Sequence, residues 1–254
     1  MSDWKKRMFD GYVSTGQARA PEDLEGLANP YYDRLIAAHL PTNKEILIVD
    51  LASGHGRLIY SLKKSGYKNV VGVDISKEQV ATAHRLGLTE VQHQDISEFL
   101  QEAKAESFDV IFLMDILEHL EEQETLDLLD KVHRTIRKSG VLVLHVPNGE
   151  GLFGMRVRYG DFTHRRAYTS MSIGQVLSAC GFEMTKCLED KPAIHGVKSF
   201  VRFILWETLT MPFRILLTAE SGVTGHILSQ NLLAIARKSP DSRSSRSLTA
   251  TADL

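Results

Sequence analysis

The sequence has few of the residues and runs that mark specialised classes of protein. Its 254 residues include two cysteines, Cys180 and Cys187, which suit a reducing compartment and are too few for a cysteine-rich metal site. The formal net charge is only −2, so the basic excess that attracts nucleic acid is lacking, and nucleic-acid binding is not expected. The start, Met1–Arg7, has no apolar run of the kind found in secretory signals. A cytoplasmic location is therefore expected.

What is present is typical of one α/β domain. Hydrophobic residues make up 43% and charged residues 24% of the chain, as in ordinary globular proteins. Short apolar and β-branched runs, which suit strands buried in a parallel sheet, alternate with helical patterns. The runs predict strands at 46–49, 70–73, 91–94, 108–114, 141–146, 182–188 and 231–237. Helices are expected at 58–62, 76–86, 97–100, 121–137 and 172–180, with a long loop over 149–165.

The first strand, turn, helix and second strand carry the strongest functional signal. Asp50 closes the first strand, and a glycine turn containing Gly54 and Gly56 follows it. A dinucleotide fingerprint, G-x-G-x-x-G, would have its third glycine at Ile59, so the pattern differs from that of NAD-binding proteins. Asp74 ends the second strand, where it is placed to accept hydrogen bonds from ribose hydroxyls in the crevice at the sheet edge. A nucleotide-free turn and a nicotinamide-dependent dehydrogenase are the alternatives.

The pattern acid-x-x-x-G-x-G, with an acid ending the next strand, resembles the class I S-adenosylmethionine (SAM) methyltransferases. The resemblance implies a Rossmann-like seven-stranded α/β sheet with its last strand antiparallel, and SAM as the cofactor. The residues that would contact SAM are Asp50, Ala52, Gly54, Gly56, Asp74, Ile75, Asp95, Ile96 and Met114. Asp95 would meet the adenine amine and Ile96 the adenine face, although Asp95 is also a candidate N-cap of the next helix. Ser76 with Gln79 predicts a capping box for the helix over 76–86.

A second polar group follows the fourth and fifth strands. Its members are expected at one edge of the sheet and are Asp115, Glu118, His119 and His164. Two carboxylates and two imidazoles could hold a divalent cation (Mg²⁺, Mn²⁺, Fe²⁺ or Zn²⁺), which would lower the pKa of a substrate hydroxyl. Without metal, the catalytic candidates are His119, His164 and Asp115, with either histidine as general base. His119 could instead be an imidazole bonded at a helix start, and His55 and His145 are expected to be loop or core histidines.

The acid-x-x-acid-His group resembles that of ubiquinone-pathway O-methyltransferases and plant small-RNA 2′-O-methyltransferases, with Asp115 in place of glutamate. Further segments look like bacterial methyltransferases of surface-polysaccharide gene clusters; they are 11–17, 146–151, 158–164 and 229–232. This resemblance implies methyl transfer to a sugar hydroxyl, in polysaccharide or secondary-metabolite biosynthesis. A polar lining for the sugar is expected from Asn148, Arg156, Arg158 and Asp161. An amine, carbon or aromatic hydroxyl acceptor and a non-catalytic SAM-binding subunit are the alternatives.

An N-terminal helical segment is expected over 1–40, before the methyltransferase domain at 41–238. Its aromatic clusters indicate helices separated by a proline-containing loop. The segment either packs on the domain as a flap or forms a lid over the crevice, with Tyr12, Gln17 or Tyr32 touching ligand.

Residues 198–220 interrupt the C-terminal part of the domain. Charges and Pro212 break their apolar run, so it does not span a bilayer, and two amphipathic helices are predicted. These helices could pack on the core, form a homodimer contact or lie on a membrane surface as a peripheral contact. The final residues, 239–254, are rich in Ser, Thr and Arg and are expected to be a disordered tail.

Overall fold

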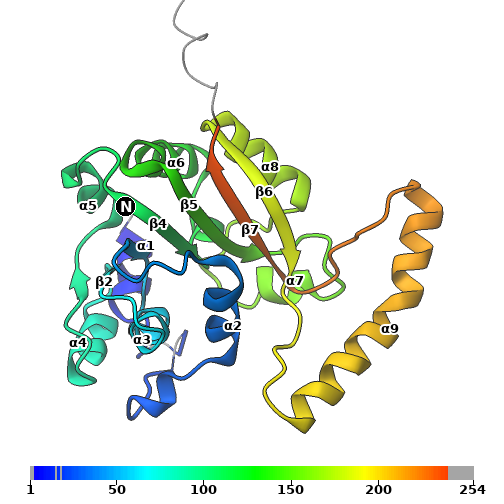
Figure 1. The fold of residues 1–254 in the computed structure, drawn as a ribbon, viewed down its shortest axis with the longest axis horizontal. Helices are drawn as coiled ribbons and strands as arrows, with labels where there is room; N and C mark the ends of the chain where they lie inside the picture. Colours follow the sequence, from blue (N-terminus) through cyan, green and yellow to red (C-terminus); the bar gives the residue numbers. More distant parts are fainter. Residues whose placement is uncertain (1–2, 15, 18, 240–254) are drawn as a thin grey trace, which may run out of the picture.

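Seven strands form one sheet in the order β3-β2-β1-β4-β5-β7-β6 (Figure 1). The structure is a computed structural model that describes residues 3–14, 16–17 and 19–239. The strands are β1 (Leu47–Leu51), β2 (Asn69–Asp74), β3 (Val91–His93), β4 (Phe108–Met114), β5 (Ile136–Pro147), β6 (Phe182–Glu189) and β7 (Asn231–Lys238). β1 to β5 are parallel, whereas β7 is antiparallel to both β5 and β6. The predicted Rossmann-like seven-stranded sheet with an antiparallel last strand is confirmed.

Helices cover both faces of the sheet. The α-helices are α1 (Asp3–Asp10), α2 (Pro30–His39), α3 (Arg57–Lys64), α4 (Lys77–Arg85), α5 (Ile96–Glu102), α6 (Glu122–Thr135), α7 (Gly154–Arg158), α8 (Ser170–Ala179) and α9 (Val197–Ser221), and the 3₁₀ turns are η1 (Glu25–Leu27) and η2 (Leu117–His119). Successive side chains of a strand point to opposite faces. In β4, Val110 and Phe112 therefore pack with α2, α3 and α4, while Ile111 and Leu113 pack with α5, α6 and α8. Burial on both faces explains why this strand is an uninterrupted apolar run.

Two boundaries differ from the sequence predictions. α6 ends at Thr135 and β5 begins at Ile136, five residues before the predicted strand. The register between β4 and β5 shifts at this point, and a Cβ added at Gly140 would lie only 2.6 Å from Cγ1 of Ile136. The loop predicted over 149–165 contains the short helix α7. The early start of β5 depends on its pairing with β4, and a pattern of neighbouring residues does not predict such pairing.

The capping box predicted at the start of α4 is wrong. Ser76 is the N-cap residue, but its side chain makes no capping hydrogen bond. Its backbone N–H donates to Oδ1 of Asp74 at 2.8 Å. Oε1 of Gln79 lies 3.0 Å from Nδ1 of His55, which donates to it. Because Gln79 is used across the glycine turn, its side chain is not available to cap the helix.

Residues 198–220 form one continuous helix and not the two predicted. α9 runs for 25 residues with Pro212 inside it. Proline has no backbone N–H and removes one bond of the helix, but Pro212 lies on an exposed side where water can reach the freed carbonyl. Figure 1 shows α9 beyond the β6 edge of the sheet, apart from the other helices. Among the described residues, no helix has both the length and the hydropathy to cross a membrane.

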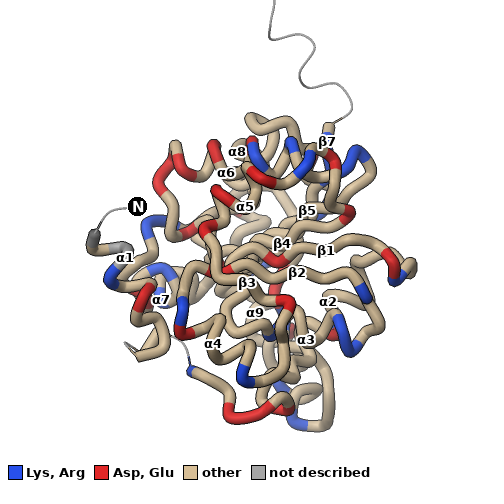
Figure 2. Tube along the Cα trace, turned by 90° about the vertical axis from the view of Figure 1, so that its left-hand side faces the viewer, with Lys and Arg blue, Asp and Glu red and all other residues tan. Residues whose placement is uncertain are grey.

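Charges are distributed without one dominant sign. In the view of Figure 2, Lys and Arg residues alternate with Asp and Glu residues along the surface loops and helices. The tail predicted over 239–254 lies outside the described residues, apart from Ser239.

Candidate functional site

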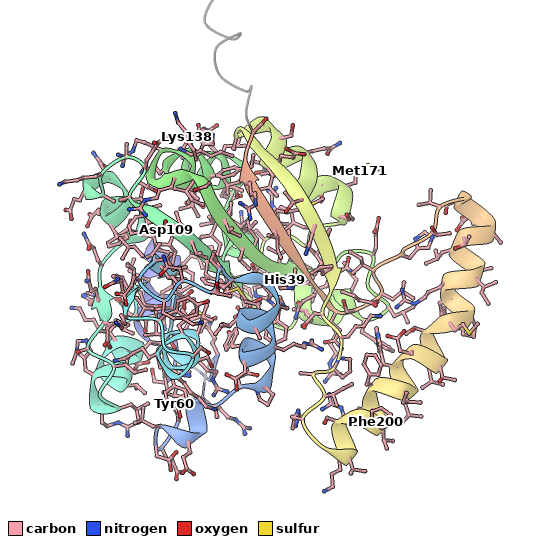
Figure 3. The ribbon with its side chains drawn as sticks, in the orientation of Figure 1. His39, Tyr60, Asp109, Lys138, Met171 and Phe200 are labelled. Atoms are coloured by element: carbon pink, nitrogen blue, oxygen red, sulfur yellow. The ribbon has the colours of Figure 1, made fainter. Side chains whose placement is uncertain are left out.

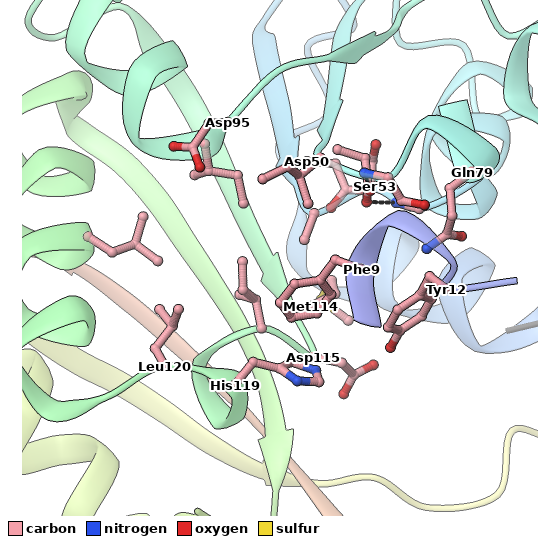
Figure 4. A pocket seen from close by; sticks show the side chains of 18 of the residues that line it. Phe9, Tyr12, Asp50, Ser53, Gln79, Asp95, Met114, Asp115, His119 and Leu120 are labelled. Carbon is pink, nitrogen blue, oxygen red and sulfur yellow. Dashed lines mark hydrogen bonds between the residues drawn. The ribbon is translucent and has the colours of Figure 1, made fainter. Parts of the chain in front are cut away.

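A cavity of about 770 Å³ opens where β1, β2 and β4 end (Figure 4). Parallel strands bring their carboxyl ends to one sheet edge, so residues far apart in the sequence share this cavity. Eight of the nine residues predicted to contact the cofactor line it: Asp50, Ala52, Gly54, Asp74, Ile75, Asp95, Ile96 and Met114. The volume is in the range of small-molecule and cofactor sites.

The glycine turn is held in place by the acid of the next strand. The backbone N–H of Gly54 donates to Oδ2 of Asp74 at 2.7 Å. Gly54 has a φ of +58°, and a Cβ there would lie 2.9 Å from Oε1 of Gln79. The positive φ therefore favours glycine at this position, and a Cβ would also displace the end of the Gln79 side chain.

Gly56 has a role in packing. It does not line the cavity. Its φ is +83°, and a Cβ on it would lie 2.8 Å from Leu88 and 3.1 Å from Val91. The second glycine of the turn thus allows the start of α3 to pack against Leu88 and Val91, and its contact with the cofactor stays a prediction.

Asp50 and Asp74 place two buried carboxyl groups on the cavity wall. Burial raises the pKa of Asp50 well above its usual range, and the charges of Asp74 and Asp115 raise it further. Within the described part of the chain, Oδ1 of Asp50 has no hydrogen-bond partner. Burial also raises the pKa of Asp74, opposed by the N–H groups of Ser76 and Gly54. Buried polar atoms normally have partners, so this edge suits a ligand that brings hydroxyl donors or positive charge.

Both roles predicted for Asp95 are compatible with its position. Oδ1 of Asp95 accepts hydrogen bonds from the backbone N–H groups of Ser97 at 2.7 Å and Glu98 at 3.3 Å. Asp95 is thus the N-cap of α5. The residue also lines the cavity next to Ile96, and its contact with an adenine amine stays a prediction.

The N-terminal segment closes one side of the cavity. Phe9 and Tyr12 line it, as does Tyr32 of α2, whereas Gln17 does not. Oε2 of Glu78 accepts hydrogen bonds from the backbone after Tyr12 at 2.9 and 3.1 Å. Figure 4 shows Phe9 and Tyr12 reaching the pocket from α1 and the turn after it.

Three of the four residues predicted to bind metal come together. The ligating atoms of Glu118, His119 and His164 lie within 4.8 Å of one another. Oε1 of Glu118 is 3.9 Å from Nε2 of His164. Burial, and then the charge of Asp115, raises the pKa of Glu118 well above its usual range. Oε2 of Glu118 is buried without a partner among the described residues, which leaves a carboxyl group that needs a proton or a cation.

Hydrogen bonds fix both imidazoles in one tautomer. Asp161 accepts the hydroxyl proton of Thr163 at 2.6 Å, so Oγ1 of Thr163 in turn accepts the proton on Nδ1 of His119 at 2.8 Å. Nδ1 of His164 donates to the carbonyl of Val157 at 3.0 Å. Nε2 of each histidine therefore keeps its lone pair. Burial lowers the pKa of His119 to about 4, so this imidazole is neutral at neutral pH. The sequence patterns did not reveal the role of Thr163.

Asp115 does not join this group, contrary to the prediction. It lines the cavity, but Oδ1 lies 2.6 Å from Nδ1 of His145, and Nε2 of His145 lies 3.3 Å from Asp190. Burial alone would lower the pKa of His145, but these two carboxylates raise it well above its usual range. Enclosure by the cavity walls opposes ionisation of Asp115, although its side chain is half-exposed to solvent there, and the charge of His145 lowers its pKa. His145 is buried as predicted, but as part of a charged chain that keeps Asp115 ionised.

Residues 48–140 match the family model described as a methyltransferase domain. The matched span runs from β1 to the start of β5 and contains all nine residues predicted to contact the cofactor. Over this span the chain is similar to methyltransferase domains, and its sheet has the class I methyltransferase fold.

Individual relatives of this methyltransferase domain differ in their reactions. The tRNA U34 carboxymethyltransferase of Cellvibrio japonicus (strain Ueda107) is 29% identical over 136 residues, which are 50% of this chain and 41% of that protein. This chain therefore matches less than half of the length of that relative. In the complex between the Haloferax volcanii Trm112 methyltransferase activator and the putative methyltransferase, a chain has a TM-score of 0.65 at 15% identity, covering 91% of this chain and 97% of that one.

A second solved structure contains a cofactor product. The 1,6-didemethyltoxoflavin-N1-methyltransferase of Burkholderia thailandensis, with bound 1,6-didemethyltoxoflavin and S-adenosylhomocysteine, has a TM-score of 0.55 at 18% identity, covering 93% of this chain and 86% of that one. Both structural likenesses show the methyltransferase fold, and neither defines the substrate of this domain.

The polar lining predicted for a sugar is wrong for the cavity of this methyltransferase domain. None of its four residues lines the described cavity. Asn148 is buried and its amide is used by the backbone: Nδ2 donates to the carbonyls of Ile227 and Ser229, and Oδ1 accepts from the N–H of Glu150. Charged residues that the motifs did not predict do line it: Arg57, Glu98, Glu124, Asp127 and Lys131. Three of them lie on α6, whose polar face gave no local sign that it borders a cavity.

Replacing His145 by glutamine should destabilise the methyltransferase domain by about 1–2 kcal/mol near pH 6, because a hydrogen bond between charged groups is lost. The loss is not larger because water screens the half-exposed carboxylate of Asp115. The folded pKa of His145 is above its unfolded value of about 6.5. The contribution is thus complete below about pH 6.5 and decreases as the pH rises through the folded pKa. Urea unfolding at pH 6 and pH 9 measures it.

The matched control is His39→Gln on α2. Burial lowers the pKa of His39, so the free-energy change for this variant should shift with pH in the opposite direction. An equal cost of His145→Gln at both pH values would contradict the charged pair with Asp115.

Proposed function

We propose that the protein transfers the methyl group of SAM to a hydroxyl of a sugar or a related small polar substrate, in polysaccharide or secondary-metabolite biosynthesis. The observation that carries the proposal is the juxtaposition of two sites at one sheet edge. A cavity lined by Asp50 and Asp74 suits a nucleoside with a positive charge, and it reaches His119, whose free Nε2 suits a proton acceptor.

The domain would hold SAM through residues at the ends of β1 to β3. Asp74 has lone pairs left for the ribose hydroxyls beside its bonds to Gly54 and Ser76. Ile75 and Ile96 provide apolar contact for the adenine, and Asp50 faces the positive part of the ligand. When bound, SAM would supply a methyl group attached to a sulfonium sulfur. The substrate oxygen forms the new C–O bond, the S–CH₃ bond breaks, and the rest of the cofactor leaves as S-adenosylhomocysteine.

His119 would act on the hydroxyl that receives the methyl group. The chain from Asp161 through Thr163 fixes the proton on Nδ1 of His119. Nε2 is therefore positioned to take the hydroxyl proton as the oxygen attacks the methyl carbon. A positioned general base of this kind contributes about 10²–10⁴-fold to the rate.

As the alternative to His119 acting as the base, a divalent cation is proposed at Glu118, His119 and His164, where Nε2 of His119 would be a ligand and not a proton acceptor. One carboxylate and two imidazoles suit Mg²⁺, Mn²⁺, Fe²⁺ or Zn²⁺. The buried, partnerless Oε2 of Glu118 and the two fixed Nδ1 protons fit such a site, because metal-binding histidines usually donate their other N–H to a neighbouring acceptor. The ion would lower the pKa of the substrate hydroxyl.

Other acceptors and partners are less well supported by the site. The relative from Cellvibrio acts on tRNA by its name, but the formal charge of −2 gives this chain no basic excess to attract tRNA. In the view of Figure 2, Lys and Arg residues are interspersed with Asp and Glu residues. The similarity to the Haloferax structure, at 15% identity, shows a shared fold and does not support an activator protein as a partner of this chain. A non-catalytic SAM-binding subunit would need none of the Glu118, His119 and His164 cluster.

Product analysis by mass spectrometry tests the proposal. The wild-type protein, given SAM and separate panels of nucleotide sugars, sugar lipids, phenols, amines and tRNA, should methylate a sugar hydroxyl. His119→Ala should form product at a rate lower by about 100-fold or more under the same conditions. Methylation confined to amines, to carbon or to tRNA would contradict the O-methyl assignment.

A further inference from the structure

The outward face of α9 is apolar, while its inward face contains its polar anchors. Buried Ser199 and Thr210 and half-buried Arg214 follow one side of the helix. Ten large apolar side chains of α9 are 46% to 81% exposed: Val197, Phe200, Val201, Ile204, Leu205, Leu209, Met211, Phe213, Ile215 and Leu216. This is the reverse of a surface helix that packs its apolar face on a core.

Ion pairs on the inward side hold α9 in this orientation. Both carboxylate oxygens of Glu189, at the end of β6, accept hydrogen bonds from Arg214 at 2.7 Å. Nζ of Lys191 lies 2.7 Å from Oε1 of Glu207 on the helix. Because Glu189 is itself buried and also accepts the N–H of Leu228, the helix cannot roll its apolar face inward without breaking a buried pair.

The exposed face is too broad for a seam between two helices. At 100° per residue, nine of these ten side chains fall within an arc of about 180°, from Phe200 round to Leu209, which includes one charged residue, Lys198. A coiled-coil seam covers a narrower stripe. The ten side chains present on the order of 1,000 Å² of apolar surface, more than the patches that most monomers expose.

We infer that the outward face of α9 binds the surface of a lipid bilayer that carries anionic headgroups. A flat interface covers about half of a helix lying in it, as the arc requires. Exposed Ile194 and Val223 extend the apolar surface past both ends of the helix. Lys198 and Arg202 are exposed in its N-terminal half, where cations meet anionic headgroups.

Within residues 3–14, 16–17 and 19–239, no other segment covers this face, whose side chains stay exposed. Figure 1 shows α9 at the outer edge of the molecule with its far side turned away from the sheet. The C-terminal residues 240–254 are mostly Ser, Thr, Arg, Asp and Ala, with two leucines, so their composition does not suit an apolar face. The inference does not depend on the methyl acceptor proposed above.

Vesicle co-sedimentation tests the inference with the full chain. The wild type should sediment with vesicles of phosphatidylcholine and phosphatidylglycerol, and more weakly with phosphatidylcholine alone. Val201→Glu and Ile215→Glu, one on each side of Pro212, should each lower the partition coefficient about tenfold or more, because a charge replaces an inserted apolar group. Met171→Glu is the matched control and should change it less than twofold.

Met171 suits that purpose because it is 74% exposed and belongs to α8, and Figure 3 shows it well away from Phe200, which lies near the start of α9. All three substitutions replace exposed side chains, and circular dichroism should show unchanged folding. Absence of the wild type from the vesicle fraction, or equal partition of all variants, would overturn the inference. So would a concentration-dependent dimer in analytical ultracentrifugation that Ile215→Glu dissociates while vesicle binding is missing, since a second copy would then cover the face.

Discussion

Replacing Asp74 by alanine should weaken the binding of S-adenosylhomocysteine by about 100-fold or more. Hydrogen bonds to a charged group contribute about 1.5–3 kcal/mol each, and two ribose hydroxyls would lose theirs. The variant also loses the acceptor for the N–H groups of Gly54 and Ser76, so the glycine turn is no longer held against the cavity. Isothermal titration calorimetry measures the loss.

A pair of glycine variants separates the cavity from general strain. Gly54→Val places a side chain at a φ of +58° and against Gln79, whereas Gly87→Val has a similar backbone strain, with a φ of +82°, and open space around it. Gly87 does not line the cavity. Only Gly54→Val should weaken binding tenfold or more, and equal losses in the two variants would show that binding follows overall stability.

His119→Ala should lower kcat by about 10²–10⁴-fold while leaving the affinity for S-adenosylhomocysteine within about threefold. The reason is separation in the fold: the residues proposed to hold the nucleoside follow β1 to β3, while His119 and His164 follow β4 and β5. Single-turnover kinetics beside calorimetry measures both quantities.

Chelation distinguishes the two roles open to His119. With a cation at Glu118, His119 and His164, a chelator should abolish turnover, one of the metals named above should restore it, and Glu118→Gln should lose about as much rate as His119→Ala. Glu122→Gln is the control, since Glu122 starts α6 outside the cavity. Full activity in chelator, with Glu118→Gln near wild type, would refute the metal and leave a base mechanism.

Local patterns were sufficient for the sheet and for most of the cofactor wall. Strand β4 was predicted with its observed ends because burial on both faces makes it an unbroken apolar run. Asp50, Gly54 and Asp74 could be placed together because parallel strands end at one edge. Such inferences need only neighbours in the sequence and one rule of sheet geometry.

The second site could be predicted only in part, because its partners come from distant segments. Asp115 has a φ of +55°, and its carboxylate meets His145 of β5, backed by Asp190 after β6. The spacing of residues 115, 118 and 119 suggested one helical turn, and it could not reveal that the backbone at Asp115 has a positive φ and directs its carboxylate to His145. The continuous α9 was missed for a related reason: an exposed Pro212 is tolerated once Arg214 is tied to Glu189.

Titration of the wild-type protein with S-adenosylhomocysteine and, separately, with NAD tests the central claim most directly. The claim is that the cavity bounded by Asp50, Gly54 and Asp74 is a SAM site. Saturable binding of one S-adenosylhomocysteine per chain, with no heat from NAD, is the predicted result. Binding of NAD, or no binding of either ligand by folded protein, would contradict it.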